Sequence, residues 1–174
     1  MKDIYESEMK FGSFSEMDLF EIEKSQLLKK LGKGIKSVEF ILLNKKRNII
    51  FLEAKKTCQN ENNMHQTKEK EEKFGEYYDS IAEKFAESLQ VYMASIVNRY
   101  DDQEEVGENL RKIEDYHDKR IQLVLVIKEA ETEWLAGPKA ILEEKLLTLR
   151  KIWKAEIVVL NYELAKKYNL VGNV

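Results

Sequence analysis

The sequence predicts an α/β protein in which a small mixed sheet is flanked by helices. Three observations support this fold class: two apolar segments around a polar turn within 35–56, a long helical pattern over 66–100, and a strand–helix–strand pattern over 121–160. The 174 residues include only one proline and seven glycines, so linker material is scarce. We therefore expect a single domain over 1–174.

The first part of the chain is expected to contain a short edge strand around residues 8–14, then a helix and a β-hairpin. Ser15 is in position to cap a helix that ends at Gly32. Residues 35–43 and 49–56 are rich in β-branched and aromatic side chains, and residues 44–48 between them are polar. This pattern predicts a hairpin after the helix.

The second part is expected to alternate helices and strands. Aromatic and aliphatic residues keep a 3.6-residue period through 66–100, which predicts a long amphipathic helix. The segments 121–127 (IQLVLVI) and 155–160 (AEIVVL) are typical buried strands, with a helix predicted over 138–152 between them. This connection is long enough for a right-handed parallel crossover. A short helix over 161–168 completes the prediction.

Composition excludes several classes of protein. With 43% hydrophobic and 10% aromatic residues, the chain can bury a core and is not a disordered tail. No apolar segment approaches the ~18 residues of a membrane span, and the polar start does not match a signal peptide. The single cysteine, Cys58, cannot form an intrachain disulfide. We expect a cytoplasmic protein without a membrane partner.

Basic residues are concentrated in one part of the chain. From Lys24 to Lys56, ten basic residues accompany two acidic ones, a local charge of +8, and the net charge of −3 leaves −11 elsewhere. Such segregation can create a local phosphate-binding surface, but solvated helix faces and hairpin tips are also often rich in lysine. The candidate contacts to a nucleic-acid backbone are Lys33, Lys36, Lys45, Lys46, Arg47 and Lys56.

The residues that could carry chemistry lie on the predicted hairpin. Residues two apart in a strand share a face, so Glu53 and Lys55 project together. If the turn has an odd number of residues, so that Asn44 pairs with Asn48, then Glu39 lies directly across from Glu53. A turn one residue longer or shorter would place the two carboxylates on opposite faces.

Two carboxylates in this arrangement would repel, because directly opposite Cβ atoms are about 4.5–5.5 Å apart. A hard cation such as Mg²⁺, which Mn²⁺ can replace, would convert the repulsion between Glu39 and Glu53 into coordination. Lys55 could then orient or deprotonate a water molecule and stabilise charge on a phosphate. The alternative is a surface Glu–Lys pair with Glu39 merely solvated.

These residues resemble the PD-(D/E)xK nuclease superfamily, which includes type II restriction endonucleases and archaeal Holliday-junction resolvases. Its pattern is an acidic residue on one strand, a hairpin, and a hydrophobic strand that ends in (D/E)-x-K, usually with a glutamate on the preceding helix. In VEFILLNKKRNIIFLEAK, Glu39 is similar to the first acidic residue and Glu53-Ala54-Lys55 to the second motif. Glu23 resembles the helix glutamate, and Glu21 is the neighbouring option.

The resemblance implies a restriction-endonuclease-like fold in α-β-β-β-α-β order. It covers a core of about 15–128, followed by a strand–helix extension over 129–174. One strand of that core must come from the region before residue 35 or be missing.

The resemblance also implies a metal-dependent nuclease that hydrolyses phosphodiester bonds of DNA. Glu39 and Glu53 would hold Mg²⁺, Glu23 would support them, and Lys55 would activate water. The alternative is a non-catalytic member of the same fold that binds nucleic acid or protein, with the helix over 66–100 as an interface. A domain this small would need a second copy or a partner to grip both strands of a duplex, so a homodimer is a candidate assembly.

Overall fold

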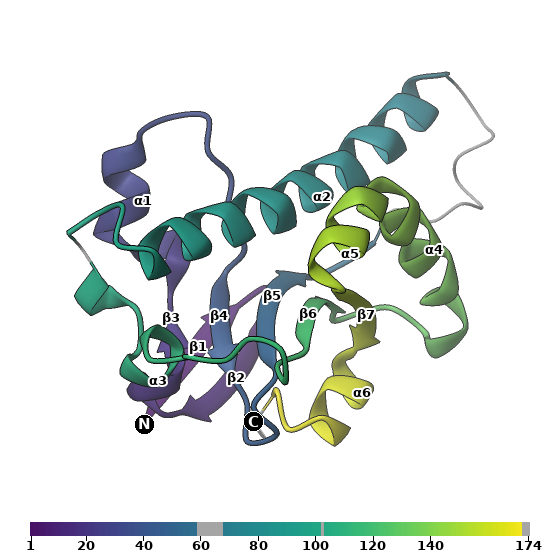
Figure 1. The fold of residues 1–174 in the computed structure, drawn as a ribbon. Coiled ribbons are helices and arrows are strands. Elements are labelled where there is room, and N and C mark those ends of the chain that lie inside the picture. Colours follow the sequence, from purple (N-terminus) through teal and green to yellow (C-terminus); the bar gives the residue numbers. More distant parts are fainter. Residues whose placement is uncertain (59–67, 102, 172–174) are drawn as a thin grey trace.

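A computed structural model describes residues 1–58, 68–101 and 103–171 of the chain (Figure 1). The strands are β1 (Lys2–Glu6), β2 (Met9–Phe14), β3 (Leu19–Phe20), β4 (Phe40–Leu43), β5 (Ile49–Lys55), β6 (Ile121–Ile127) and β7 (Glu156–Asn161). The α-helices are α1 (Gln26–Leu31), α2 (Lys68–Ile96), α3 (Glu108–Arg111), α4 (Ala136–Lys145), α5 (Leu147–Trp153) and α6 (Tyr162–Lys167). The 3₁₀ turns are η1 (Glu16–Asp18), η2 (Ile22–Lys24), η4 (Gln103–Glu105) and η5 (Thr132–Trp134).

The main sheet has five strands in the order β3-β4-β5-β6-β7. The pairs β3–β4 and β4–β5 are antiparallel, whereas β5–β6 and β6–β7 are parallel. The α/β class with a mixed sheet is therefore confirmed, as is the parallel crossover between β6 and β7. Because β7 pairs with β6, the C-terminal segment completes the same sheet.

Helices and a hairpin cover opposite faces of this sheet. In Figure 1, α2, α4 and α5 lie on one side, and the β1–β2 hairpin and α6 lie on the other. Alternation along β5 assigns Ile49 and Phe51 to the core under α2, and Ile50 and Leu52 to the core under the hairpin. Both faces are thus buried, which explains why these strands are apolar at almost every position.

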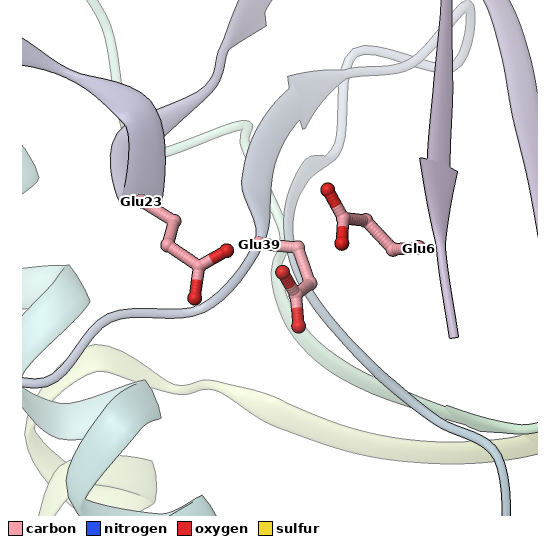
Figure 2. Close-up of side chains that lie close together, drawn as sticks. All are labelled: Glu6, Glu23 and Glu39. Carbon is pink, nitrogen blue, oxygen red and sulfur yellow. The ribbon is translucent and has the colours of Figure 1, made fainter. Parts of the chain in front are cut away.

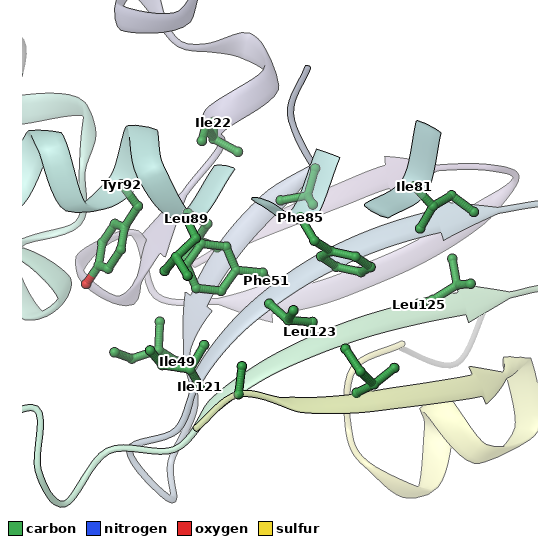
Figure 3. Packing of buried hydrophobic residues seen from close by; sticks show 14 of the residues in the cluster. Ile22, Ile49, Phe51, Ile81, Phe85, Leu89, Tyr92, Ile121, Leu123 and Leu125 are labelled. Atoms are coloured by element: carbon green, nitrogen blue, oxygen red, sulfur yellow. The ribbon is translucent and has the colours of Figure 1, made fainter. Parts of the chain in front are cut away.

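The long helix packs through the stripe that its sequence predicted. Figure 3 shows Ile81, Phe85, Leu89 and Tyr92 above Phe51 and its sheet neighbours. The rings of Phe51 and Tyr92 meet edge to face, with centroids 5.8 Å apart. This packing fixes which side of α2 faces the sheet and hence which of its polar residues lie over the end of β5.

The predicted helix from Ser15 to residue 31 is wrong. The segment instead forms η1, β3, η2 and a shorter α1. Leu19 and Phe20 pair with Leu42 and Ile41 of β4, so the sheet takes residues whose spacing alone indicated a helix. Sheet pairing with a distant segment outweighed the local preference. The strand β3 lies before residue 35, so the strand that the sequence left either in that region or missing is present.

The residue that caps the helix in this segment also differs from the prediction. Ser15 caps only the short turn η1, where its hydroxyl accepts from the Met17 N–H. Ser25 caps α1 by accepting from the Leu28 N–H. The Glu105 carboxylate accepts from the remaining free N–H groups of Gln26 and Leu27, at 2.7 and 3.0 Å. A long-range carboxylate therefore helps to define where α1 begins.

The other element predictions differ mainly in their bounds. The strand predicted over 35–43 begins at Phe40, and the helix predicted over 138–152 is divided at Leu146 into α4 and α5. The strand over 121–127 is confirmed with the same bounds. Residues 66 and 67 of the predicted long helix lie outside the described residues. Within the described part of the chain, no helix is both long and apolar enough to cross a membrane.

Candidate functional site

The β4–β5 hairpin has the register that brings Glu39 and Glu53 together. The Asn44 N–H donates to the Asn48 carbonyl at 3.0 Å, which confirms the odd-length turn. At the other end, the Glu39 N–H donates to the Leu52 carbonyl at 3.0 Å and extends the pairing beyond β4. Both carboxylates therefore lie on the face of the sheet that α2 covers.

Glu53 is fully buried, with 0% of its surface exposed. The Lys84 Nζ lies 2.8 and 3.1 Å from its two carboxylate oxygens, and the Lys55 Nζ lies 2.7 Å from Oε1. Burial alone would lower the pKa of Lys84, but the charge of Glu53 and the hydrogen bonds to it raise that pKa instead. Two ammonium groups thus compensate a carboxylate that burial would otherwise make very costly.

Sequence reasoning did not identify Lys84. This lysine lies three residues after Ile81 and four before Ser88, both of which are buried on the side of α2 that faces the sheet. That spacing was a usable signal, because a lysine within an apolar stripe needs an anionic partner. Ser88 also accepts from the Val38 N–H at 2.8 Å and so holds the residue before Glu39 against α2.

Glu39 belongs to a second cluster, made with Glu6 and Glu23. One carboxylate oxygen from each of the three residues lies within 4.8 Å of the others. Figure 2 shows Glu23 of η2 and Glu6 of β1 projecting toward Glu39 from either side. Glu39 is also near Lys84, whose Nζ lies 4.0 Å from its Oε1. The same Nζ lies 2.8 Å from Glu53 Oε1. The Oε1 atoms of Glu39 and Glu53 are therefore separated by no more than the sum of these two distances.

The environment of Glu39 favours its protonated form. Burial, a hydrogen bond with Glu23 and the charges of Glu53 and Glu23 raise the pKa of Glu39 to about 8. The Glu39 carboxyl is therefore largely protonated near neutral pH. The positive charge of Lys84 is not sufficient to cancel this effect.

The structure distinguishes between the two glutamates considered on the N-terminal segment. Glu23 joins Glu39, as the resemblance implied, although it projects from a 3₁₀ turn and not from a long helix. Glu21 instead forms ion pairs with Lys2 and, at 3.7 Å, with Lys24. Glu6 was missed, because no β1–β2 hairpin was predicted to bring it near the site.

The donor set fits a hard cation chemically. Carboxylate oxygens are the ligands that Mg²⁺ and Mn²⁺ prefer, and Glu6, Glu23 and Glu39 supply three of them in one place. The same groups are equally compatible with carboxylates that share protons. Glu53 differs, because both of its oxygens already accept from Lys84.

The predicted nucleic-acid contacts do not all lie at this end of the molecule. Lys45, Lys46 and Arg47 occupy the β4–β5 turn, at the opposite end of the hairpin from Glu53. Glu53 lies six positions after Arg47, and in extended backbone this corresponds to about 20 Å. A ligand that contacts both groups must extend along the length of the hairpin.

The other three predicted contacts lie outside this turn, in the connection from α1 to β4 or directly after β5. Lys33 is exposed in the connection from α1 to β4. Lys36, in the same connection, forms an ion pair with Glu83 of α2. Lys56 directly follows β5, and its Nζ lies 2.7 Å from Glu8. Lys56 is thus the predicted contact that is adjacent in sequence to Lys55.

A separate cleft of about 580 Å³ lies beside the N-terminal segments. Its lining includes Glu21, Lys24, Ser25 and Arg111 but none of the clustered carboxylates. Lys24 links the two regions, because its Nζ lies 2.6 Å from Glu6.

Comparison of the chain with protein-family models, with curated proteins and with solved structures finds no match.

Proposed function

We propose that the protein is a divalent-metal-dependent nuclease that hydrolyses phosphodiester bonds of DNA. The observation that supports this most strongly is the convergence of Glu39, Glu53 and Lys55 at one end of the β4–β5 hairpin. A strand sequence that is otherwise apolar has no folding reason to place two carboxylates and a lysine there. A phosphodiester site needs this combination of anionic oxygens and a nearby ammonium group.

Each residue then has a distinct role. Glu39 and Glu53 would hold the cation, and Glu6 and Glu23 add carboxylate oxygens beside Glu39. When bound, the cation would supply a nucleophilic water at neutral pH and neutralise charge on the phosphate. Lys55 is 30% exposed, so its ammonium can contact both Glu53 and a substrate oxygen. Lys84 would orient Glu53 from the buried side.

The connectivity supports a restriction-endonuclease-like fold as part of this proposal. Strands β3, β4 and β5 are antiparallel neighbours, and α2 then leads to β6, which is parallel to β5. This matches the β-β-β-α-β part of the order that the resemblance implies. The chain departs from that order where η2 and α1 lie between β3 and β4.

A cleavage assay tests the proposal. Purified protein is incubated with labelled single-stranded and duplex DNA in Mg²⁺, in Mn²⁺ and in EDTA. We expect cleavage only with a divalent cation, and loss of that cleavage in Glu53→Gln. The matched control is Glu163→Gln, an exposed glutamate of α6, which should cleave like the wild type. Cleavage that persists unchanged in Glu53→Gln would remove the proposed mechanism.

One observation favours a second function, a non-catalytic member of the same fold that binds nucleic acid or protein. The Lys84 ammonium contacts Glu53 and lies 4.0 Å from Glu39, so a positive charge already lies between these carboxylates. Calorimetric titration with Mn²⁺ separates the two functions. Heat of binding that disappears in Glu39→Gln supports the nuclease, and absence of binding in the wild type favours the second function.

A further inference from the structure

The turn of the β1–β2 hairpin lies against the end of β5, close to the candidate site. The Ser7 Oγ donates to the Ala54 carbonyl at 3.0 Å. The two oxygens of Glu8 accept from two different lysines, Lys56 at 2.7 Å and Lys128 at 3.0 Å. A single carboxylate therefore bridges two ammonium groups.

The main sheet holds these two lysines side by side. Lys56 directly follows β5 and Lys128 directly follows β6, which is its parallel neighbour. The Lys128 N–H donates to the Lys55 carbonyl at 2.9 Å, which continues the ladder beyond the strands. The backbone positions of Lys56 and Lys128 are therefore set by the sheet and do not depend on Glu8.

The turn does not have the sequence that its backbone prefers. Ser7 and Glu8 both have left-handed backbone angles, with φ of 48° and 59°. Hairpin turns of this kind favour Asn-Gly, because most other residues adopt positive φ at a conformational cost. Turn propensity does not explain a glutamate here, whereas its contact with two lysines does.

We propose that Lys56 and Lys128 form a phosphate-binding subsite beside the carboxylate site, and that Glu8 occupies this subsite in the substrate-free protein. A carboxylate and a phosphate both present anionic oxygens to ammonium donors. The Glu8 contacts are exposed, with 56% of its side chain accessible, and such ion pairs are weak and displaceable. The assignment of the phosphate to a nucleic acid rests on the proposed nuclease function.

The subsite lies where a neighbouring phosphate of the same strand would pass. Lys55 and Lys56 are consecutive, so their side chains leave the chain on opposite faces at the same end of β5. A nucleic-acid strand that crosses this end would place one phosphate near Lys55 and Glu53, and the adjacent phosphate near Lys56 and Lys128. The Glu8 carboxylate would have to release Lys56 and Lys128 before these two lysines can contact the phosphate.

Binding without cleavage tests the inference directly. The affinity of a fluorescently labelled single-stranded oligonucleotide is measured by anisotropy in EDTA for the wild type and for Glu8→Gln. We expect Glu8→Gln to bind the oligonucleotide about tenfold more tightly than the wild type. In the wild type the Glu8 carboxylate must first release Lys56 and Lys128, whereas in the variant both lysines are already free to bind phosphate. Glu8→Asn, whose side chain tolerates positive φ, should give the same gain if glutamine disturbs the turn.

A matched control separates the loss of a competitor from the loss of a charge. Glu129 is exposed on the same surface and lies 4.0 Å from Lys56 without bridging the two lysines. Glu129→Gln removes the same charge and should change affinity much less than Glu8→Gln. Adding Lys56→Gln and Lys128→Gln to the Glu8→Gln protein should abolish the gain. Equal effects of Glu8→Gln and Glu129→Gln, or a gain that survives loss of both lysines, would overturn the inference.

A calorimetric titration with inorganic phosphate identifies the source of the ligand. Tighter binding of the oligonucleotide alone in Glu8→Gln assigns the subsite to a nucleic-acid backbone, and tighter binding of both ligands shows that a free phosphate also enters. Unchanged affinity for both overturns the subsite. These results do not depend on catalysis. A wild type that cleaves DNA while Glu8→Gln binds no more tightly would leave the nuclease proposal standing and remove only this inference.

Discussion

Replacement of Lys84 by methionine would leave the buried carboxylate of Glu53 with one cationic partner instead of two. Methionine keeps most of the apolar stem of lysine, so packing between α2 and the sheet should change little. The perturbation is then mainly electrostatic. It removes both hydrogen bonds from the Lys84 Nζ, at 2.8 and 3.1 Å, and retains the 2.7 Å contact from Lys55.

The expected magnitude follows from burial. Removing one partner of a buried ion pair costs about 3–5 kcal/mol, because an uncompensated charge remains. Here Glu53 is 0% exposed, but Lys84 is 17% exposed and Lys55 still compensates part of the charge. We therefore expect Lys84→Met to lower the free energy of unfolding by about 2–3 kcal/mol. The double variant with Glu53→Gln should lose less than the sum of the single variants.

Urea denaturation followed by circular dichroism at pH 7 in EDTA measures this loss. The matched control is Lys73→Met on the same helix, where Lys73 pairs with Glu69 at 2.6 Å but both side chains are more than half exposed. That exposed pair should contribute less than about 1 kcal/mol. A loss below about 1 kcal/mol for Lys84→Met, or additivity with Glu53→Gln, would refute the assignment of Lys84 as the main partner of a buried charge.

Three further predictions concern pH, a tight contact and the core. The pKa of Glu39 is raised from 4.5 to about 8 in the folded protein, so the folded state retains a proton that the unfolded chain has released. Without metal, stability should fall as pH rises from about 5 to 9, and urea titrations of Glu39→Gln should show a smaller fall. In Gly107→Ala, the new Cβ would lie 2.6 Å from the Met17 carbonyl oxygen. Urea denaturation should therefore show that the free energy of unfolding falls by about 1–3 kcal/mol. An unchanged denaturation midpoint would contradict this contact. Phe51→Ala should cost about 3–5 kcal/mol by the same assay, because Phe51 is fully buried under α2, and a loss below about 1 kcal/mol would contradict this packing.

The parts of the fold that could be predicted from sequence are those that local patterns define. The bounds of β6 match the continuous apolar segment 121–127, because a strand buried on both faces needs apolar residues throughout. The prediction that Glu39 and Glu53 lie on the same face of the sheet depended on the odd number of residues in the turn between β4 and β5. The long helix α2 followed from a stripe that continues over many turns.

The parts that failed depend on contacts between distant segments. Leu19 and Phe20 have helical spacing with their neighbours, but they pair with β4 more than twenty residues later. Glu6 reaches the site only because the β1–β2 hairpin packs under the sheet. Lys84 is a different case, because its place between Ile81 and Ser88 was visible in the sequence. Its role required knowing that β5 ends beneath it.

The most direct test of the proposed nuclease is the rate of DNA cleavage by Lys55→Met under single-turnover conditions. The assay uses Mn²⁺ and an excess of protein over a labelled oligonucleotide. We expect Lys55→Met to cleave at least about 100-fold more slowly than the wild type, while its DNA affinity in EDTA changes little. Lys55 is partly exposed, so the variant should keep its fold, which circular dichroism checks. A wild type that cleaves no form of DNA with either cation, or a Lys55→Met variant that cleaves at the wild-type rate, would contradict the account.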